Sequence, residues 1–177
     1  MKTTILNNVV SEKELYFMYN QIINNPSWRL NGEATSQRGF LTGPTFPVKV
    51  NDNIEHYPFF VWGQTIVYRI AKLLESKHIG IPTDLDRMWF NATYSGKKTQ
   101  HWLHADDKQN FTTRSILLFM TPVWQPDWRG SFYVDGKEYK YKPGSAVIYD
   151  SKEFHCGESS ESEKYNWLRV ACNILVK

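Results

Sequence analysis

The segment "QHWLHADD", residues 100–107, gathers side chains that can bind a metal ion or transfer a proton. It holds two of the chain's five histidines and two adjacent carboxylates. If the segment is extended, His104 and Asp106 point to the same side, because side chains alternate along a strand, and His101 points to the other. An imidazole and a carboxylate on one face can share a divalent ion. This pairing is a weak signal by itself, so a third ligand is needed.

His155, in "DSKEFHCGES", is the histidine best placed to be that third ligand. It follows a predicted strand, "SAVIYD", and two facing sheets can bring the ends of distant strands together, so its 49-residue separation from Asp106 is no obstacle. His56 and His78 precede the strand-rich part of the chain and are predicted to be structural or surface groups. Cys156 points away from His155 in an extended segment, and we interpret it as structural.

Two histidines and one carboxylate on one face of an octahedral ion form the ligand set of non-haem Fe(II) oxygenases, which leaves three positions for a co-substrate and O₂. Zinc would prefer a closed tetrahedron, or three ligands and a water. Arg169 favours iron over zinc. It lies fourteen residues after His155 in the last predicted strand, where its guanidinium could bind a carboxylate through two hydrogen bonds.

Two helices are predicted ahead of the strands that would carry these residues. "SEKELYFMYNQIINN" opens with a capping box formed by Ser11 and Glu14, continues with apolar residues on one helical face, and ends before Pro26. A second helical pattern runs over about 59–78, and Gly80 is placed to terminate it. The Gly-, Pro- and Asn-rich residues 29–58 between the helices predict loops with one short strand near 38–41.

After Gly80 the pattern changes to strands joined by short turns. The predicted strands lie in "RMWFNATY", "TRSILLFM", "SFYVDGKEYKY", "KPGSAVIYD" and "NWLRVACNILV", and Asp135-Gly136 signals a type I′ hairpin. This order predicts a mainly β protein, a double-sheet jelly roll with the helices packed on one outer face. We expect a single domain over 1–177, with helical support over about 11–80 and the jelly-roll core over about 86–176.

Composition restricts the function classes. A chain of 177 residues that is 41% hydrophobic and 15% aromatic can bury a core, so disorder is excluded. The net charge of +3 is spread without dense basic blocks, which permits an anionic partner without requiring one. Two cysteines, no apolar span long enough for a membrane and no signal-peptide core predict a cytoplasmic protein without membrane attachment. The oligomeric state is not predicted.

The motif order resembles that of the 2-oxoglutarate- and Fe(II)-dependent dioxygenases, most closely the prolyl 4-hydroxylase-like branch. The resemblance covers about Met88 to Val176 and rests on "YSGKKTQHWLHAD", "RSILLFM", "RGSFYV", "KPGSAVIY", "HCG" and "RVA". It implies a double-stranded β-helix with Fe(II) bound by His104, Asp106 and His155, and with Arg169 on the distal carboxylate of 2-oxoglutarate. It also implies that Tyr94 lies near the co-substrate. The chain departs from many relatives at position 171, an alanine where they carry a second hydroxyl or basic residue.

Three functions follow as hypotheses. The first is an oxygenase that uses 2-oxoglutarate and O₂, releases succinate and CO₂, and hydroxylates a prolyl or other peptide side chain or a small molecule. The second is a cupin-like metal protein, an isomerase or a sensor, that does not use 2-oxoglutarate. The third is a nucleic-acid-binding module. Nucleic-acid dealkylases of the superfamily carry a second arginine six residues after the first, and the leucine at position 175 argues against such a substrate.

Overall fold

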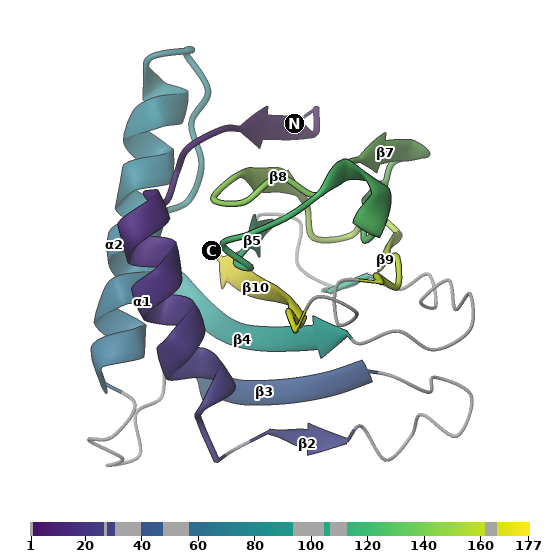
Figure 1. Ribbon diagram of the computed structural model, residues 1–177. Helices are drawn as coiled ribbons and strands as arrows, with labels where there is room; N and C mark the ends of the chain where they lie inside the picture. Colours follow the sequence, from purple (N-terminus) through teal and green to yellow (C-terminus); the bar gives the residue numbers. More distant parts are fainter. Residues whose placement is uncertain are drawn as a thin grey trace.

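The computed structural model describes residues 2–26, 28–30, 40–47, 57–93, 105–106, 113–161 and 166–177. Two helices and two antiparallel sheets make up the mainly β architecture that the sequence predicts (Figure 1). None of the helices in these ranges is both long enough and apolar enough to cross a membrane. The elements, in chain order, are β1 (Thr4–Leu6), α1 (Glu12–Ile23), β2 (Arg29–Leu30), β3 (Phe40–Pro47), α2 (Tyr57–Glu75), β4 (Leu85–Thr93), β5 (Arg114–Phe119), the 3-10 helix η2 (Pro126–Trp128), β6 (Phe132–Val134), β7 (Lys137–Tyr139), β8 (Ala146–Asp150), β9 (His155–Gly157) and β10 (Arg169–Val176).

The first helix, α1, begins where the capping box predicts. The Ser11 hydroxyl accepts a hydrogen bond from the backbone N–H of Glu14 at 3.3 Å, which satisfies one N–H of the first turn. The second helix, α2, ends earlier than predicted, at Glu75. His78 takes a left-handed conformation with φ of 59°, and the N–H of Ile79 bonds to the carbonyl of Leu74 at 3.0 Å. The helix therefore closes before Gly80 is reached.

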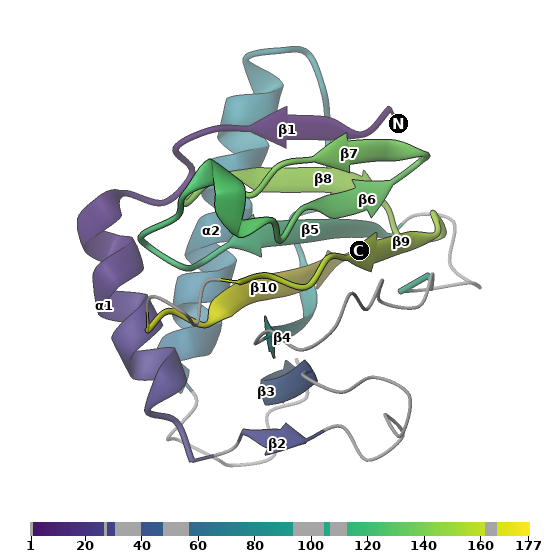
Figure 2. The same ribbon diagram turned by 45° about the vertical axis from the view of Figure 1, so that its right-hand side comes forward.

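The larger sheet has seven strands in the order β1-β8-β5-β10-β4-β3-β2, and the smaller has three in the order β7-β6-β9. Both helices pack against one face of the larger sheet, and the smaller sheet lies across its other face (Figures 1 and 2). Gly63 allows α2 to approach β4 closely, because a Cβ there would lie 2.6 Å from the sulfur of Met88. The β1, β2 and β3 strands, which precede residue 86, also belong to the larger sheet.

Strand β10 shows how the two faces of the larger sheet differ. Val170, Cys172, Ile174 and Val176 belong to the apolar core beneath the helices, whereas Ala171 belongs to a second apolar core between the two sheets. The second core is more aromatic and contains Phe119, Phe132, Tyr141 and Tyr149. Because side chains alternate, Arg169 and Asn173 share the inner face with Ala171. The space between the sheets is therefore where polar groups from the sequence predictions can converge.

The hairpin between β6 and β7 has the predicted turn. Asp135 and Gly136 both have positive φ, 53° and 65°, as a type I′ turn requires. The turn brings β6 and β7 into register, with Val134 opposite Lys137. On its other edge β6 pairs with β9, where Val134 lies opposite His155. The hairpin thus fixes the smaller sheet on which His155 sits.

Candidate active site

The structure brings Asp106 and His155 together in the interior. Nε2 of His155 lies 3.5 Å from Oδ1 of Asp106, and each side chain is only 4% exposed. Nδ1 of His155 is 3.1 Å from the backbone carbonyl oxygen of Glu153. A carbonyl only accepts, so this contact requires Nδ1 to carry the hydrogen, and in a neutral imidazole Nε2 then has a lone pair.

This geometry places two acceptor atoms face to face. A neutral imidazole nitrogen and an ionised carboxylate oxygen repel each other unless a cation, either a proton or a metal ion, lies between them. Two ligand atoms that are each about 2.0–2.2 Å from one ion and roughly at right angles lie about 3 Å apart. A separation of 3.5 Å is longer than a normal N–H···O hydrogen bond and close to that ligand–ligand spacing. The pair fits two ligands of a shared ion.

The other oxygen of Asp106 is held by two hydroxyl groups. The Ser115 hydroxyl on β5 donates to Oδ2 at 2.6 Å, and the Tyr149 hydroxyl on β8 donates to the same atom at 3.0 Å. Burial, with a contribution from the Asp106 charge, raises the pKa of Tyr149 well above its usual value, so the phenol keeps its proton and remains a donor. Both bonds orient the carboxylate so that Oδ1 faces His155.

Aromatic rings hold the His155 imidazole in place. The ring centroids of Tyr149 and Phe132 lie 5.0 and 5.5 Å from the imidazole centroid, the first in an edge-on arrangement. His155 itself is 3% exposed. A rigid, dry imidazole with one nitrogen bonded to the backbone is the usual form of a metal-binding histidine.

Two of the predicted site residues, His104 and Tyr94, lie outside the residues that the structure describes. Within the described ranges no third His, Cys, Asp or Glu joins Asp106 and His155 in a metal-binding cluster. The third ligand therefore stays a prediction for His104. Asp106 is described as part of the short stretch 105–106, whereas His104, two positions earlier in the predicted ligand motif, is not.

Arg169 is buried at the start of β10, with 3% of its surface exposed. Its Nε donates to the carbonyl oxygen of Gly130 at 2.7 Å, and Cζ lies 5.3 Å from the centroid of the Tyr141 ring. Its Nη2 atom is buried and has no hydrogen-bond partner among the described residues. Burial lowers the pKa of the guanidinium, although a guanidinium remains charged in proteins. A buried cation with an unused donor is suited to receive an anion.

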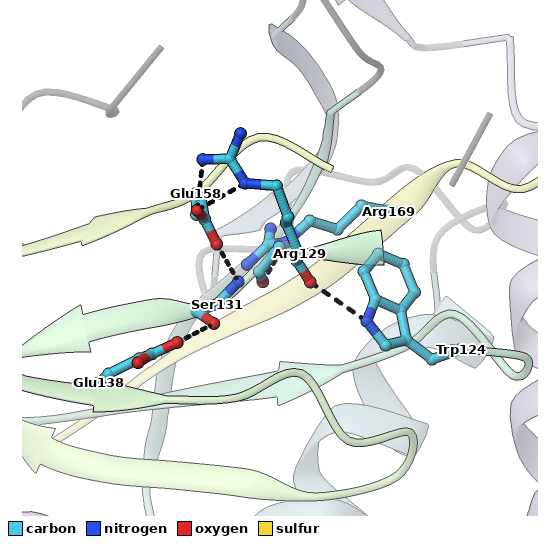
Figure 3. A network of polar contacts seen from close by, with 7 residues as sticks. Trp124, Arg129, Ser131, Glu138, Glu158 and Arg169 are labelled. Carbon is cyan, nitrogen blue, oxygen red and sulfur yellow. Dashed lines mark hydrogen bonds and ion pairs between the residues drawn. The ribbon is translucent and has the colours of Figure 1, made fainter. Parts of the chain in front are cut away.

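A network of polar contacts joins the residues beside Arg169 (Figure 3) and includes both neighbours of Gly130, whose carbonyl accepts from Arg169. Glu158 accepts two bonds from the Arg129 guanidinium at 2.9 and 2.5 Å and one from the backbone N–H of Ser131 at 3.1 Å. Trp124 donates its indole N–H to the carbonyl oxygen of Arg129 at 3.2 Å. Glu158 thus holds both residues that flank Gly130.

Gly130 also permits the close approach of Arg169. Its φ is +80°, and a Cβ there would lie 2.6 Å from the Trp124 ring and 3.0 Å from Cδ of Arg169. The preceding residue, Arg129, has a φ of 61°, which is unusual for a side-chain-bearing residue and depends on the contacts to Glu158 and Trp124. The turn after η2 therefore packs closely against the side chain of Arg169.

Sequence reasoning did not find the residues that support these groups. Tyr149 and Ser115 hold Asp106, and Gly130 and Tyr141 hold Arg169. Alternation along the predicted strand "SAVIYD" does place Tyr149 on the same face as Val147, so a buried phenol could have been expected there. The carbonyl of Gly130 had no sequence signal, because a backbone acceptor is available at every residue.

Solved structures share this fold over almost the whole chain. A Pseudomonas putida prolyl-4-hydroxylase aligns with 99% of this chain and 91% of its own, with a TM-score of 0.62 and 15% identity. The non-haem α-ketoglutarate-dependent epimerase SnoN from nogalamycin biosynthesis aligns with 98% of this chain and 75% of its own, with a TM-score of 0.68 and 11% identity. A Trichoplax adhaerens prolyl hydroxylase, in complex with a hypoxia inducible factor peptide fragment, covers 98% and 82%, with a TM-score of 0.60 and 14% identity.

No protein-family profile matches the sequence, and no curated protein is similar to it at a significant level. The likeness is therefore one of fold. The fold is that of structures described as 2-oxoglutarate- and Fe(II)-dependent oxygenases, as the motif order predicts. These structures include both hydroxylases and an epimerase, so the fold alone does not select the reaction.

Proposed function

We propose that this protein is a non-haem Fe(II)- and 2-oxoglutarate-dependent oxygenase. The observation that carries the proposal is the buried Arg169, whose Nη2 atom has no partner among the described residues and which lies on the inner face of the same sheet as Ser115, a holder of Asp106. One interior thus contains an anion-binding cation and a carboxylate–imidazole pair. The proposal takes residues 1–177 as one domain, with the two facing sheets as a double-stranded β-helix.

Asp106 and His155 would hold the Fe(II) ion together with His104, which lies outside the described residues. The donor set of two imidazoles and one carboxylate suits Fe(II) with open positions. The iron would supply the activation of O₂. Ser115 and Tyr149 keep Asp106 oriented, and the Glu153 carbonyl keeps the tautomer of His155 in which Nε2 is the ligand atom.

Arg169 would bind the distal carboxylate of 2-oxoglutarate. The bond from Nε to the carbonyl of Gly130 holds the guanidinium in place, and its buried Nη2 has no partner among the described residues. A carboxylate in this dry site would form charge-assisted hydrogen bonds that water does not weaken. The Tyr141 ring beneath the guanidinium adds a cation–π contact and excludes solvent.

The prime substrate is proposed to be a prolyl or other peptide side chain, or a small molecule. The peptide fragment in the Trichoplax adhaerens structure, which has this fold, supports the peptide option. The epimerase SnoN, which has the same fold, supports the small-molecule option. We propose hydroxylation with release of succinate and CO₂ as the reaction.

The test is binding and turnover of 2-oxoglutarate by the purified protein. Under anaerobic conditions the Fe(II) protein is expected to bind 2-oxoglutarate with calorimetric saturation and to develop a metal-to-ligand charge-transfer band. In air it is expected to form succinate slowly without a prime substrate. Stoichiometric metal binding without any 2-oxoglutarate binding would contradict the oxygenase and favour the cupin-like metal protein.

A further inference from the structure

Three buried side-chain atoms lack a hydrogen-bond partner among the described residues, and all three lie on the inner face of the larger sheet. They are Oγ1 of Thr93, Nη2 of Arg169 and Nδ2 of Asn173. Arg169 and Asn173 flank Ala171, which packs in the core between the sheets. Thr93 is the residue directly opposite Arg169 on β4, and its neighbour Ala92 packs beneath the helices, so Thr93 faces inward.

Unpartnered polar atoms are rare in a folded interior, because a buried donor without an acceptor is destabilising. Thr93 is 1% exposed, Arg169 3% and Asn173 6%, so bulk water does not supply the missing hydrogen bonds. Two of the atoms can only donate, and the hydroxyl can donate. Their common requirement is therefore a set of oxygen acceptors between the two sheets. We call Thr93, Arg169 and Asn173 the inner polar row.

The inner polar row has an order along β10. Arg169 and Thr93 form one end. Ala171 follows, opposite Phe119, and then Asn173, opposite Leu117. The next inward position, Leu175, lies opposite Ser115, whose hydroxyl holds Asp106. The row thus leads from Arg169 toward the Asp106–His155 pair, with about 13 Å between the Cα atoms of Arg169 and Asn173.

Ala171, between the two ends of the row, has the smallest side chain among the inward-facing residues of β10. Its methyl group separates Arg169 from Asn173 with less bulk than any other side chain on this face of the strand. An elongated acid lying over Ala171 would have one end at Arg169 and Thr93 and the other at Asn173, nearer the predicted metal. This arrangement matches a dicarboxylic oxo acid better than a small inorganic anion, which would satisfy only one end.

We propose that Thr93 and Asn173 are further binding residues for the co-substrate. This inference rests on the proposed function. The Thr93 hydroxyl donates to the distal carboxylate beside Arg169 and so supplies, from the neighbouring strand, the hydroxyl that position 171 lacks. The Asn173 amide donates to an oxygen at the oxo-acid end. Specificity for a five-carbon diacid comes from the distance between these two donors.

The first experiment addresses Thr93 by calorimetric titration of the Mn(II)-loaded protein with 2-oxoglutarate. Thr93→Val, which keeps the shape and removes the hydroxyl, is expected to weaken binding about tenfold, because a hydrogen bond to a charged group is lost. Thr93→Ser should restore most of the affinity. Thr65→Val, at an exposed position on α2, is the matched control and should bind like the parent. Equal Mn(II) affinity and equal thermal midpoints in the parent and the Thr93 variants would show that the weaker binding does not come from a loss of metal or of folding.

A second ligand tests which end of the co-substrate the Thr93 hydroxyl contacts. 2-Oxovalerate has the oxo-acid end of 2-oxoglutarate without the distal carboxylate, and its affinity is measured by displacement of 2-oxoglutarate. Thr93→Val should leave it unchanged. An equal loss for both acids, or 2-oxoglutarate binding within twofold of the parent, would overturn the assignment of Thr93.

Asn173 is tested with the same two acids. Asn173→Leu keeps much of the volume and removes the donor, and it should weaken both acids by about fivefold, since both carry the oxo-acid end. Asn173→Ala serves as the second variant if the leucine does not fold. Binding of either acid at parental strength would overturn the role of Asn173. A parent protein that binds no 2-oxoglutarate would instead contradict the proposed function, so the two failures are distinguishable.

Discussion

The hydroxyl of Tyr149 donates to one carboxylate oxygen of Asp106 at 3.0 Å, while the other oxygen faces Nε2 of His155. The phenol comes from β8, His155 begins β9, and the two rings are also in edge-on contact, with centroids 5.0 Å apart. One side chain therefore positions both of the described candidate ligands. Disturbing Tyr149 should affect metal binding although the residue is not a ligand.

Replacing Tyr149 with phenylalanine is expected to weaken Fe(II) or Co(II) binding about tenfold, because outer hydrogen bonds orient ligands and typically contribute that much or more. The ring, and with it the packing on His155, is retained. Competition titration against a chelator measures the affinity. Tyr133→Phe, on β6 and partly exposed, is the control. Parental metal affinity in Tyr149→Phe would show that the hydroxyl does not act on a ligand.

Asp106→Ala should abolish stoichiometric metal binding, and it should also lower the thermal midpoint. The hydroxyls of Ser115 and Tyr149 lose their acceptor, and each buried donor left unpaired costs about 1–3 kcal/mol. In a chain of this size each kcal/mol corresponds to about 2–4 °C. Asp106→Asn keeps an acceptor and should unfold closer to the parent while still binding metal poorly.

Metal content after anaerobic reconstitution, together with thermal unfolding, checks the Asp106 variants. Asp84→Ala, an exposed carboxylate ahead of β4, is the matched control and should retain both properties. Full metal occupancy in Asp106→Ala would remove this residue from the ligand set.

Arg169→Ala should weaken 2-oxoglutarate binding by a factor of about thirty to several thousand, which corresponds to about 2–5 kcal/mol for a buried carboxylate left without its partner. Arg169→Lys should recover only part of the loss, since an ammonium does not reproduce the planar fork. Metal binding should be nearly unchanged in both. If calorimetry gives the parental affinity for Arg169→Ala, the carboxylate anchor lies elsewhere.

Gly130→Ala should lower 2-oxoglutarate affinity without changing metal affinity. The added Cβ would clash with the Trp124 ring and lie 3.0 Å from Cδ of Arg169, at a φ of +80° that alanine adopts poorly. The carbonyl that holds Nε would shift, and the guanidinium with it. Gly80→Ala is the control, because a Cβ at Gly80 meets nothing within 4 Å. An unchanged affinity for 2-oxoglutarate would show that the Gly130 carbonyl does not position Arg169.

The Glu158→Gln variant tests the same turn by removing the ion pair between Glu158 and Arg129. Glutamine can still accept from the Ser131 N–H but no longer forms an ion pair with Arg129. Arg129 is partly exposed, so the loss should be small, about threefold in 2-oxoglutarate affinity, because exposed ion pairs contribute up to about 1 kcal/mol. Calorimetry at low and high salt checks it: salt should reduce the difference between parent and variant.

Local signals predicted the elements whose ends are specified by short-range chemistry. The Ser11 cap starts α1, and Asp135-Gly136 closes the β6–β7 hairpin as expected. β3 was predicted only as one short strand because Gly43, Pro44 and Pro47 read as loop residues, yet Phe40–Pro47 pairs with β4 along most of its length. β1 has three residues, too few for any periodicity, and its pairing with β8 is decided by tertiary contacts.

The candidate site, too, was predicted only where local sequence signals were enough. Alternation in a strand selected Asp106 together with His104, and His155 was selected as the remaining histidine at the end of a predicted strand. The structure places a nitrogen of His155 3.5 Å from an oxygen of Asp106. Tyr149, which donates to Asp106, lies 43 residues away in sequence, so no local pattern connects the two. Ser115 is nine residues from Asp106, but its contact is made from β5 and follows no helix or strand spacing. The ligand role of His104 and the role of Tyr94 stay predictions, since both lie outside the described residues.

Strand β10 follows β4 and β5 in the sequence but lies between them, in the middle of the larger sheet. All eight of its residues are buried. On the ribosome, β4 and β5 therefore expose unpaired edges until residues 169–176 have emerged, and only then can the sheet close around its centre. Such long-range pairing makes folding slow and leaves open edges available to other chains in the meantime. We expect newly made protein to need protection from aggregation until β10 is in place. In the folded sheet β10 pairs with the edges of both β5 and β4.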